Sequence, residues 1–253
     1  MVKYLTLYPN EIIREPRGSD QPWPKTLGIV ADISVGRAGW HPQTNEVCHM
    51  EISIYSLLEG ATRATGSVAV IDVFRAFTSA AVALANGASN IVMVSTVEEA
   101  LALRDAGIGQ ICMGEVGGKA PAGFDFGNSP FEISGLDFGG KRIVQRTSAG
   151  TQGIVEAATK AERLYAASLV TAKATVRALL SASPDQVSLV AMGDNGIKRT
   201  DEDELCAIHL RNRLEGRPGD AEAIRRLILV GGEVKRFNDP ARPYLHPEDV
   251  DRA

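Results

Sequence analysis

The chain contains 253 residues, of which 44% are hydrophobic, and it carries a formal net charge of -4 at pH 7. This composition is typical of a globular protein that is large enough to bury a core without disulfides. The acidic balance gives no basic surface, so we expect neither nucleic acid nor a membrane as a partner, and homo-oligomer formation stays open. Three widely spaced cysteines (Cys48, Cys112 and Cys206), with no signal peptide or stretch of transmembrane length, predict a cytoplasmic protein.

Residues 1–49 differ from the rest of the chain. Prolines, glycines and charged residues alternate there with both tryptophans, and only residues 27–33 resemble a strand. We predict an irregular N-terminal arm, or an extension upstream of a true start at Met50. The following residues, 50–253, contain no internal repeat and no clear linker, so we predict that they form a single α/β domain.

Short apolar runs alternate with helical patterns beyond residue 50. Runs rich in β-branched residues predict strands, and apolar residues at helical spacing predict helices. Thr96 and Glu99 have the spacing of a capping box and mark one helix start. The alternation predicts a mostly parallel sheet flanked by helices. The predicted strands are 52–54, 68–71, 91–94, 110–113, 142–145, 164–167 and 187–192, and the predicted helices are 77–86, 96–107, 154–161, 172–180, 201–214 and 222–229.

A charged pair follows the apolar run at residues 68–71. Asp72 ends this predicted strand, and Arg75 lies three residues later, where a helical pattern begins. In an open parallel sheet, such a strand-to-helix turn lies at the carboxyl edge, where ligands bind. In the alternative interpretation, Asp72 starts the helix and Arg75 screens its charge. This stretch alone leaves both interpretations open.

Three further polar loops follow predicted strands. They cover residues 114–130, residues 147–151, and residues 193–200 with the start of the next helix. Because the carboxyl ends of parallel strands meet at the same edge of a sheet, we expect all four loops to surround one cleft. The polar side chains that these three loops bring to it include Glu115, Asp125, Asn128, Ser129, Thr147, Ser148, Thr151 and Asp203.

This mixture of side chains favours a phosphate bound together with a divalent cation. Carboxylate oxygens suit Mg²⁺, while arginine and backbone amides bind phosphate oxygens. The turn from Thr147 through Gly150 to Thr151 lets amides approach an anion closely. Each feature also has a structural interpretation, because hydroxyls cap helices, Asn128 and Ser129 are common turn formers, and acids are favoured in the first turn of a helix.

Six motifs occur in a specific order along the chain. They are V-I-D-V-F-R-A-F-T at residues 70–78, A-N-G-A at 85–88, G-E at 114–115, G-F-D-F-G-N-S-P at 123–130, R-T-S-A-G-T at 146–151 and D-E-D-E-L-C-A at 201–207. In order and spacing they resemble the 2-phosphosulfolactate phosphatase family. The resemblance begins at about Met50 and continues to the C-terminus.

The resemblance implies a Mg²⁺-dependent acid phosphatase that removes phosphate from 2-phospho-3-sulfolactate, a step toward coenzyme M, on an α/β fold peculiar to the family. The catalytic residues that we expect from it are Asp72, Arg75 and Glu115. The expected substrate-binding residues are Asn128, Ser129, Thr147, Ser148, Gly150 and Thr151. The expected metal ligands are Asp72, Glu115, Asp125 and Asp203.

Two departures from the family pattern concern the substrate. Where the family usually has T-T-N-G-T, this chain has Thr147-Ser148-Ala149-Gly150-Thr151, so one amide side chain is missing. Where an asparagine commonly begins a later helix, the chain has Leu169-Val170-Thr171. The leading hypothesis is hydrolysis of a small phosphorylated hydroxy acid, 2-phospho-3-sulfolactate or an analogue. The alternative is a catalytically impaired binding or sensor protein on the same fold.

Overall fold

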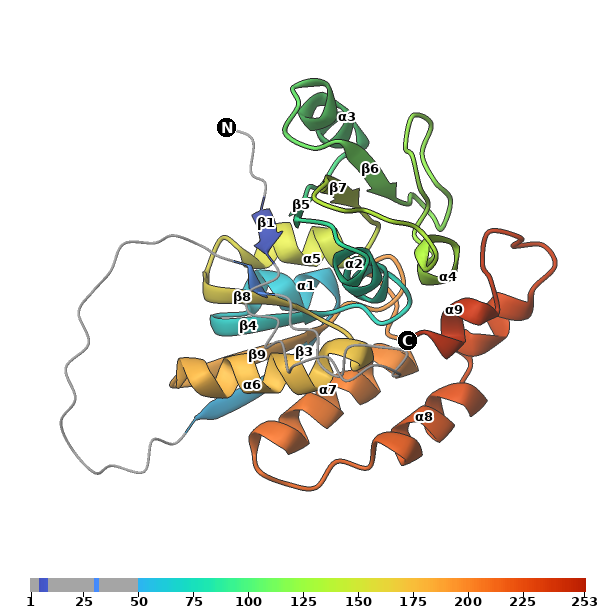
Figure 1. Cartoon of the computed structure of the whole chain (residues 1–253). Coiled ribbons are helices and arrows are strands. Elements are labelled where there is room, and N and C mark those ends of the chain that lie inside the picture. The colour runs from blue at the N-terminus through green and yellow to red at the C-terminus, as the bar shows by residue number, and fades with distance from the viewer. Residues whose placement is uncertain (1–4, 9–29, 32–49) are drawn as a thin grey trace, which may run out of the picture.

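The computed structural model describes residues 5–8, 30–31 and 50–253 (Figure 1). Within these residues the strands form one nine-stranded sheet in the order β3-β9-β4-β8-β2-β1-β5-β7-β6. Helices flank the sheet, so the predicted α/β class with a mostly parallel sheet is confirmed. The strands are β1 (Leu5–Tyr8), β2 (Val30–Ala31), β3 (Glu51–Ser56), β4 (Gly66–Ile71), β5 (Asn90–Met93), β6 (Ile111–Gly114), β7 (Arg142–Arg146), β8 (Ala161–Ala167) and β9 (Gln186–Ala191).

The sheet consists of two parallel halves that run in opposite directions. Strands β3, β9, β4 and β8 are parallel to one another, and so are β5, β7 and β6. Between the halves lie three successive antiparallel pairings, β8 with β2, β2 with β1, and β1 with β5, which reverse the strand direction. The expectation that four loops share one edge of a parallel sheet is therefore wrong in its geometry.

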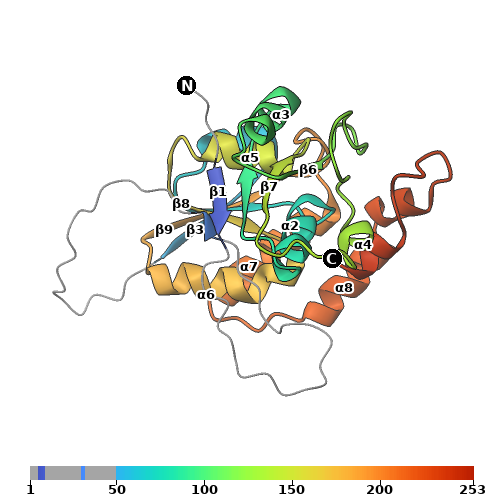
Figure 2. The same cartoon turned by 45° about the horizontal axis from the view of Figure 1, so that its top comes forward.

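The loops that follow the two halves nevertheless meet, because the sheet twists. Figures 1 and 2 show the half with β6 and β7 turned away from the half with β4 and β9. Twist accumulates across a sheet of this width, so strand ends from opposite halves can approach each other. The contact that proves the approach is a hydrogen bond from Gly150 N, just after β7, to Asp72 Oδ2, just after β4, at 2.8 Å.

Two strands come from the predicted N-terminal arm. β1 pairs with β5 and β2 pairs with β8, so both lie in the middle of the sheet and join its two halves. β2 lies within residues 27–33, which resemble a strand in the sequence. The remaining residues of 1–49 lie outside the described part, and the division into an arm and a domain stays a prediction.

Helices cover both faces of the sheet. Residues of α1, α2 and α5 pack with Val68 and Val70 of β4 on one face, and residues of α6 and α7 pack with Ala69 and Ile71 on the other. Because β4 is buried on both faces, its sequence is a continuous apolar run. α3 packs separately, on the outer face of β5, β7 and β6. The helices named here are α1 (Leu57–Arg63), α2 (Ala76–Ala85), α3 (Val97–Asp105), α5 (Gly150–Ala157), α6 (Ala172–Ala182) and α7 (Asp201–Leu214).

Shorter elements complete the described part of the chain. They are α4 (Pro130–Ile133), the 3-10 helices η1 (Leu169–Thr171) and η2 (Glu233–Asn238), α8 (Ala221–Val230) and α9 (Glu248–Asp251). The capping box at Thr96 and Glu99 is present at the start of α3, as predicted. No helix in residues 50–253 combines the length and the apolar character needed to cross a bilayer.

The start of α5 differs from the prediction. The sequence predicts a turn up to Gly153 and a helix from Ile154, but α5 begins at Gly150. A Cβ atom at residue 150 would lie 2.8 Å from Asp72 Oδ2 and 2.9 Å from Ala76 Cβ. The glycine lowers the helix propensity of the segment, yet it is required for this close approach, so tertiary packing overrides propensity.

Gly114, at the end of β6, provides a test of the sheet geometry. Its φ is +144°, and a Cβ atom there would lie 1.9 Å from Arg146 O of β7. We therefore expect Gly114→Ala to lower the free energy of unfolding by about 3 kcal/mol, through backbone strain and overpacking. Urea denaturation measures this change. The matched control is Gly135→Ala, where no atom lies within 4 Å of the added Cβ, and equal losses in both variants would contradict the geometry.

Candidate active site

Asp72 lies between β4 and α2 and is 5% exposed. Its Oδ1 accepts a hydrogen bond from Ala76 N at 3.0 Å, and its Oδ2 accepts the hydrogen bond from Gly150 N. These amides belong to the first residues of α2 and α5, where a negative charge is favoured. Burial raises the pKa of Asp72 to about 6, the two amide hydrogen bonds oppose this rise, and the nearby Glu115 carboxylate adds to it. Asp72 therefore starts α2 and also joins the two helices.

Glu115 follows β6 and is 7% exposed. Its Oε1 accepts a hydrogen bond from Ser148 N at 2.5 Å, and its Oε2 accepts hydrogen bonds from Ser148 Oγ at 3.0 Å and Gly118 N at 2.6 Å. The amides of Ser148 and Gly150, which the sequence predicts as phosphate donors, are thus both held by carboxylates. A carboxylate and a phosphate present similar oxygens to an amide, so a phosphate at this turn has to replace one of them.

The hydroxyls of Thr147 and Thr151 bind the backbone of their own turn. Thr147 N donates to Thr151 Oγ1 at 2.7 Å, and Thr151 N donates to Thr147 Oγ1 at 3.1 Å. Thr151 Oγ1 also donates to Thr147 O at 3.0 Å, and both residues are buried. The geometry supports the capping interpretation for these two hydroxyls, because their hydrogen bonds to the backbone stabilise the shape of the turn.

Asp203, in the first turn of α7, joins two loops of the site. Its Oδ1 accepts a hydrogen bond from Val73 N at 2.7 Å, and its Oδ2 accepts one from Gly193 N at 2.8 Å. Burial raises the pKa of Asp203 well above its usual value, and the charge of Asp72 adds to this rise. The preceding residue, Glu202, is 1% exposed, and its Oε2 has no hydrogen-bond partner within the described residues. Burial, with Asp203 nearby, raises the pKa of Glu202 to about 9.

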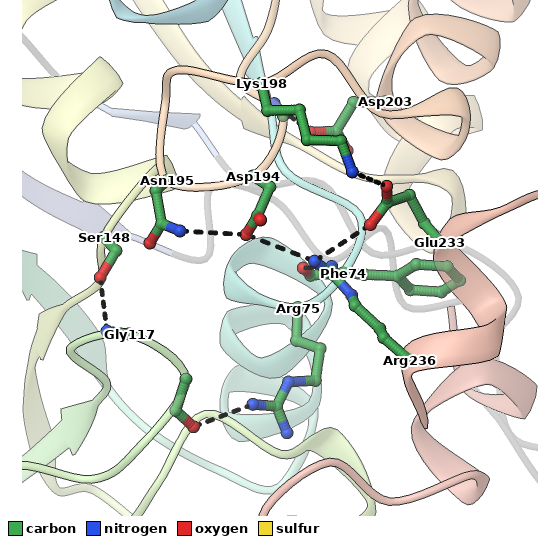
Figure 3. A network of polar contacts seen from close by, with 12 residues as sticks. Phe74, Arg75, Gly117, Ser148, Asp194, Asn195, Lys198, Asp203, Glu233 and Arg236 are labelled. Carbon is green, nitrogen blue, oxygen red and sulfur yellow. Dashed lines mark hydrogen bonds and ion pairs between the residues drawn. The ribbon is translucent and has the colours of Figure 1, made fainter. Parts of the chain in front are cut away.

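Arg236, in η2, is a site residue that the sequence analysis missed. Its Nη1 lies 3.3 Å from both Asp194 and Glu233, and its Nη2 donates to Phe74 O at 3.3 Å (Figure 3). Its positive charge lowers the pKa values of Asp72, Glu202 and Asp203 against the larger effect of burial. An arginine in a polar tail carries no motif, so only its position in the fold identifies it.

Arg75 and Ser129 meet at a different carboxylate, that of Asp249 in α9. Arg75 Nη1 donates to Asp249 Oδ2 at 2.9 Å, and Ser129 Oγ donates to Asp249 Oδ1 at 2.6 Å. In Figure 3 the Arg75 side chain extends toward the loop that carries Gly117, away from Arg236. The predicted catalytic role of Arg75 and substrate role of Ser129 stay predictions, while the structure assigns both residues a buried structural contact.

The contacts of Asp125 and Asn128 differ from those of the other predicted site residues. Asp125 Oδ2 accepts a hydrogen bond from Cys112 N at 2.8 Å and lies 3.6 Å from Arg104 Nη1 of α3. Its side chain is 42% exposed. Asn128 is buried, and its Oδ1 has no hydrogen-bond partner within the described residues. Hydrogen bonds connect Asp72, Glu115, Asp203 and the turn at 147–151, and the substrate-binding role of Asn128 stays a prediction.

The donor set at this site is rich in oxygen and strongly acidic. In residues 50–253 no group of three or more histidine, cysteine, aspartate and glutamate side chains is arranged to hold a metal ion. Mg²⁺ in proteins commonly needs only one or two carboxylates, with water and substrate phosphate as its other ligands. Each carboxylate oxygen also keeps a second lone pair after it accepts one amide hydrogen bond. Asp72 and Asp203 therefore fit a two-carboxylate site for such a cation.

The fold and the site define an α/β protein whose buried carboxylates and helix N-termini suit a cation and a small anion. A family model described as 2-phosphosulpholactate phosphatase matches residues 53–233. The chain belongs to this family. The match includes all four loops that carry the predicted site residues, whereas Arg236 and Asp249 lie outside it.

Several curated proteins are similar to this chain, and each of those described here is named probable 2-phosphosulfolactate phosphatase. A protein of Deinococcus radiodurans is 39% identical over 127 residues, which cover 50% of this chain and 53% of the relative. A protein of Bacillus subtilis is 34% identical over 185 residues, 72% of this chain and 78% of the relative. A protein of Thermotoga petrophila is 42% identical over 146 residues, which cover 58% of this chain and 61% of the relative. The chain thus aligns with only about half the length of the first of these relatives.

Glu202 predicts a pH dependence of stability. In the unfolded chain its pKa is near the usual 4.5, but in the folded protein it is about 9. Between these values the folded state holds a proton that the unfolded state has lost, so the free energy of unfolding falls as pH rises. The fall is at most about 1.4 kcal/mol per pH unit. We expect urea denaturation between about pH 5 and 8, with a chelator present, to show that the free energy of unfolding of Glu202→Gln increases relative to that of the wild type as pH rises.

The matched control for this prediction is Glu204→Gln in the same helix turn. Burial raises the pKa of Glu204, but hydrogen bonds from Arg199 and Ser56 lower it by more, so this pKa lies below its usual value. Glu204 is therefore ionised in both states over this pH range, and its substitution gives a constant difference from the wild type. A constant difference for Glu202→Gln as well would refute the raised pKa.

Proposed function

We propose that the protein is a phosphoric monoester hydrolase that removes phosphate from 2-phospho-3-sulfolactate or a close analogue. The observation that carries the proposal is the family match over residues 53–233. The names of the similar curated proteins support the same activity and substrate. The free, buried thiols of Cys112 and Cys206 fit our proposal that it acts in the reducing cytoplasm.

Mg²⁺ is the cofactor that we propose, with Asp72 and Asp203 as its carboxylate ligands. When bound, Mg²⁺ supplies a Lewis acid that neutralises charge on a phosphate oxygen. Geometry supports this choice, because Asp203 Oδ1 accepts a hydrogen bond from Val73 N, the amide of the residue that follows Asp72. Burial raises the pKa of both carboxylates, and Arg236, which lies 3.3 Å from Asp194 and Glu233, opposes part of this rise.

The protein's own groups then bind and orient the phosphate. We assign its oxygens to the amides of Ser148 and Gly150, at the start of α5, where the helix dipole favours an anion. A phosphate that takes these amides releases the carboxylates of Glu115 and Asp72 to other partners in the site. The rigid attachment of Asp72 to β4 and α2 keeps that carboxylate beside the phosphate. Asp72 or a water molecule attacks phosphorus while the bond from phosphorus to the ester oxygen breaks, and the hydroxy acid leaves with a proton that comes from water. If Asp72 is the nucleophile, a water molecule then hydrolyses the acyl phosphate to restore the carboxylate and release phosphate.

The occupied amides also favour a second candidate function, that of a binding or sensor protein without turnover. Ser148 N and Gly150 N already have carboxylate partners at 2.5 Å and 2.8 Å. Ala149 lacks the amide side chain that the family pattern has there. A protein in which no substrate displaces these carboxylates binds a cation and a ligand but releases no phosphate.

Phosphate release separates the two functions. We expect the protein to release inorganic phosphate from 2-phospho-3-sulfolactate in the presence of Mg²⁺, and a chelator to abolish this release. Mn²⁺ binding, followed by electron paramagnetic resonance, gives a readout of the cation site that is independent of turnover. Measurable binding without phosphate release from any of a panel of small phosphorylated hydroxy acids would support the sensor function instead.

Two substitutions test the assignment of the carboxylates. Asp72→Asn is expected to lower kcat at least about 100-fold and to weaken Mn²⁺ binding, because it removes charge from the centre of the site. Asp125→Asn is the matched control, since Asp125 contacts Cys112 N and Arg104 rather than Asp72. We expect its kcat to stay within about threefold of the wild type. A larger loss in Asp125→Asn than in Asp72→Asn would overturn the assignment.

A further inference from the structure

The carboxylate of Asp249 is fully buried and accepts three hydrogen bonds. It is 0% exposed, although it lies in the four-residue helix α9 close to the C-terminal end of the chain. Its Oδ2 accepts a hydrogen bond from Arg75 Nη1 at 2.9 Å, and its Oδ1 accepts hydrogen bonds from Ser129 Oγ at 2.6 Å and Phe131 N at 3.0 Å. Burial of a charge is tolerated only with such partners.

Two of these partners belong to motifs of the site. Arg75 lies three residues after Asp72, and Ser129 follows Asn128 in the long loop. Arg75 is 5% exposed, and its other contacts are to Tyr244 O at 3.1 Å and Gly118 O at 3.4 Å. The guanidinium therefore holds two loops and the C-terminal segment together, and it presents little surface to a ligand.

A continuous series of contacts joins Asp249 to Glu115. Arg75 contacts Gly118 O, Gly118 N donates to Glu115 Oε2 at 2.6 Å, and Glu115 in turn holds Ser148. On the other side of the carboxylate, Ser129 Oγ also accepts a hydrogen bond from Glu132 N and so caps α4. Both ends of the loop at residues 114–130 are therefore connected to the carboxylate of Asp249, one directly and one through Arg75.

α9 is held in place mainly by contacts with other elements. A helix of four residues has no stability of its own in water. It packs beside α4 (Figure 1), where His246 Nε2 lies 2.8 Å from Glu132 Oε1 and Arg252 lies over the Phe131 ring at 5.7 Å. Charge-assisted hydrogen bonds to Asp249 are the strongest of these contacts.

We propose that Asp249 is a positioning residue of the active site, which fixes Arg75 and Ser129 and, through Gly118, the loop of Glu115. The site is then complete only when α9 is docked. This inference rests on the proposed phosphatase function for its kinetic test, and it concerns a residue beyond the segment that the family model matches.

The first experiment compares Asp249→Asn with Asp251→Asn. Both residues lie in α9, but the Asp251 side chain is 74% exposed and its ion pair with Arg225 is long, at 3.8 Å. We expect Asp249→Asn to lower kcat at least about tenfold because the loop of Glu115 is misplaced. Asp251→Asn is expected to stay within about twofold. A kcat within twofold of the wild type in both variants overturns the proposal.

A measurement below the unfolding transition separates positioning from stability. The kcat of Asp249→Asn is measured well below the midpoint of its own thermal unfolding, where the variant is folded. If α9 only stabilises the fold, the folded variant has the kcat of the wild type. We expect its kcat to stay at least about tenfold low under these conditions. A wild-type kcat there overturns the proposal.

Hydrogen exchange tests the same inference without reference to turnover. We expect peptides that cover residues 114–119 and 126–133 to exchange at least about tenfold faster in Asp249→Asn than in Asp251→Asn. Faster exchange confined to residues 244–253 overturns the proposal. A wild type that releases no phosphate refutes only the proposed function. The hydrogen exchange of residues 114–119 and 126–133 still reports whether Asp249 positions these segments.

Discussion

The structure depends on the burial of one carboxylate, that of Asp72, between the first turns of α2 and α5. Its two oxygens accept hydrogen bonds from Ala76 N and Gly150 N, so one charge joins a helix of each half of the sheet. The halves run in opposite directions and are linked by antiparallel strands, so sheet hydrogen bonds alone do not align their ends. The charge of Asp72 satisfies two helix N-termini at once, and burial raises its pKa to about 6.

Further carboxylates repeat this arrangement around Asp72. Glu115 holds Ser148 N and Gly118 N, and Asp203 holds Val73 N and Gly193 N, so every loop of the site is fixed by an acid that accepts backbone amides. The result is a cluster of buried acids in which burial raises the pKa values of Asp72, Glu202 and Asp203, and Arg236 opposes this rise only in part. Ionising such a cluster costs stability, which is the compromise expected at a functional site.

The sequence predicts most of the elements well because their signals are local. The apolar run of β4, the capping box at Thr96 and the acidic start of α7 each depend on residues within one or two turns of the chain. The start of α5 is missed because Gly150 lowers the helix propensity. A glycine is needed there because Asp72 and Ala76, from another part of the chain, lie too close for a Cβ atom. Arg236 and Asp249 are missed because neither belongs to a motif.

By itself, the sequence determined the α/β class, the order of the motifs and the family, since periodicity and spacing are properties of the chain. It also identified the residues that meet in the site, including Asp72, Glu115 and Asp203. Only the tertiary structure decided their partners: amides at 147–151 bind carboxylates, Asp125 pairs with Arg104, and Arg75 binds Asp249. These contacts join residues that are distant in sequence, and their geometry follows from the strand order and the twist of the sheet, which no local pattern encodes.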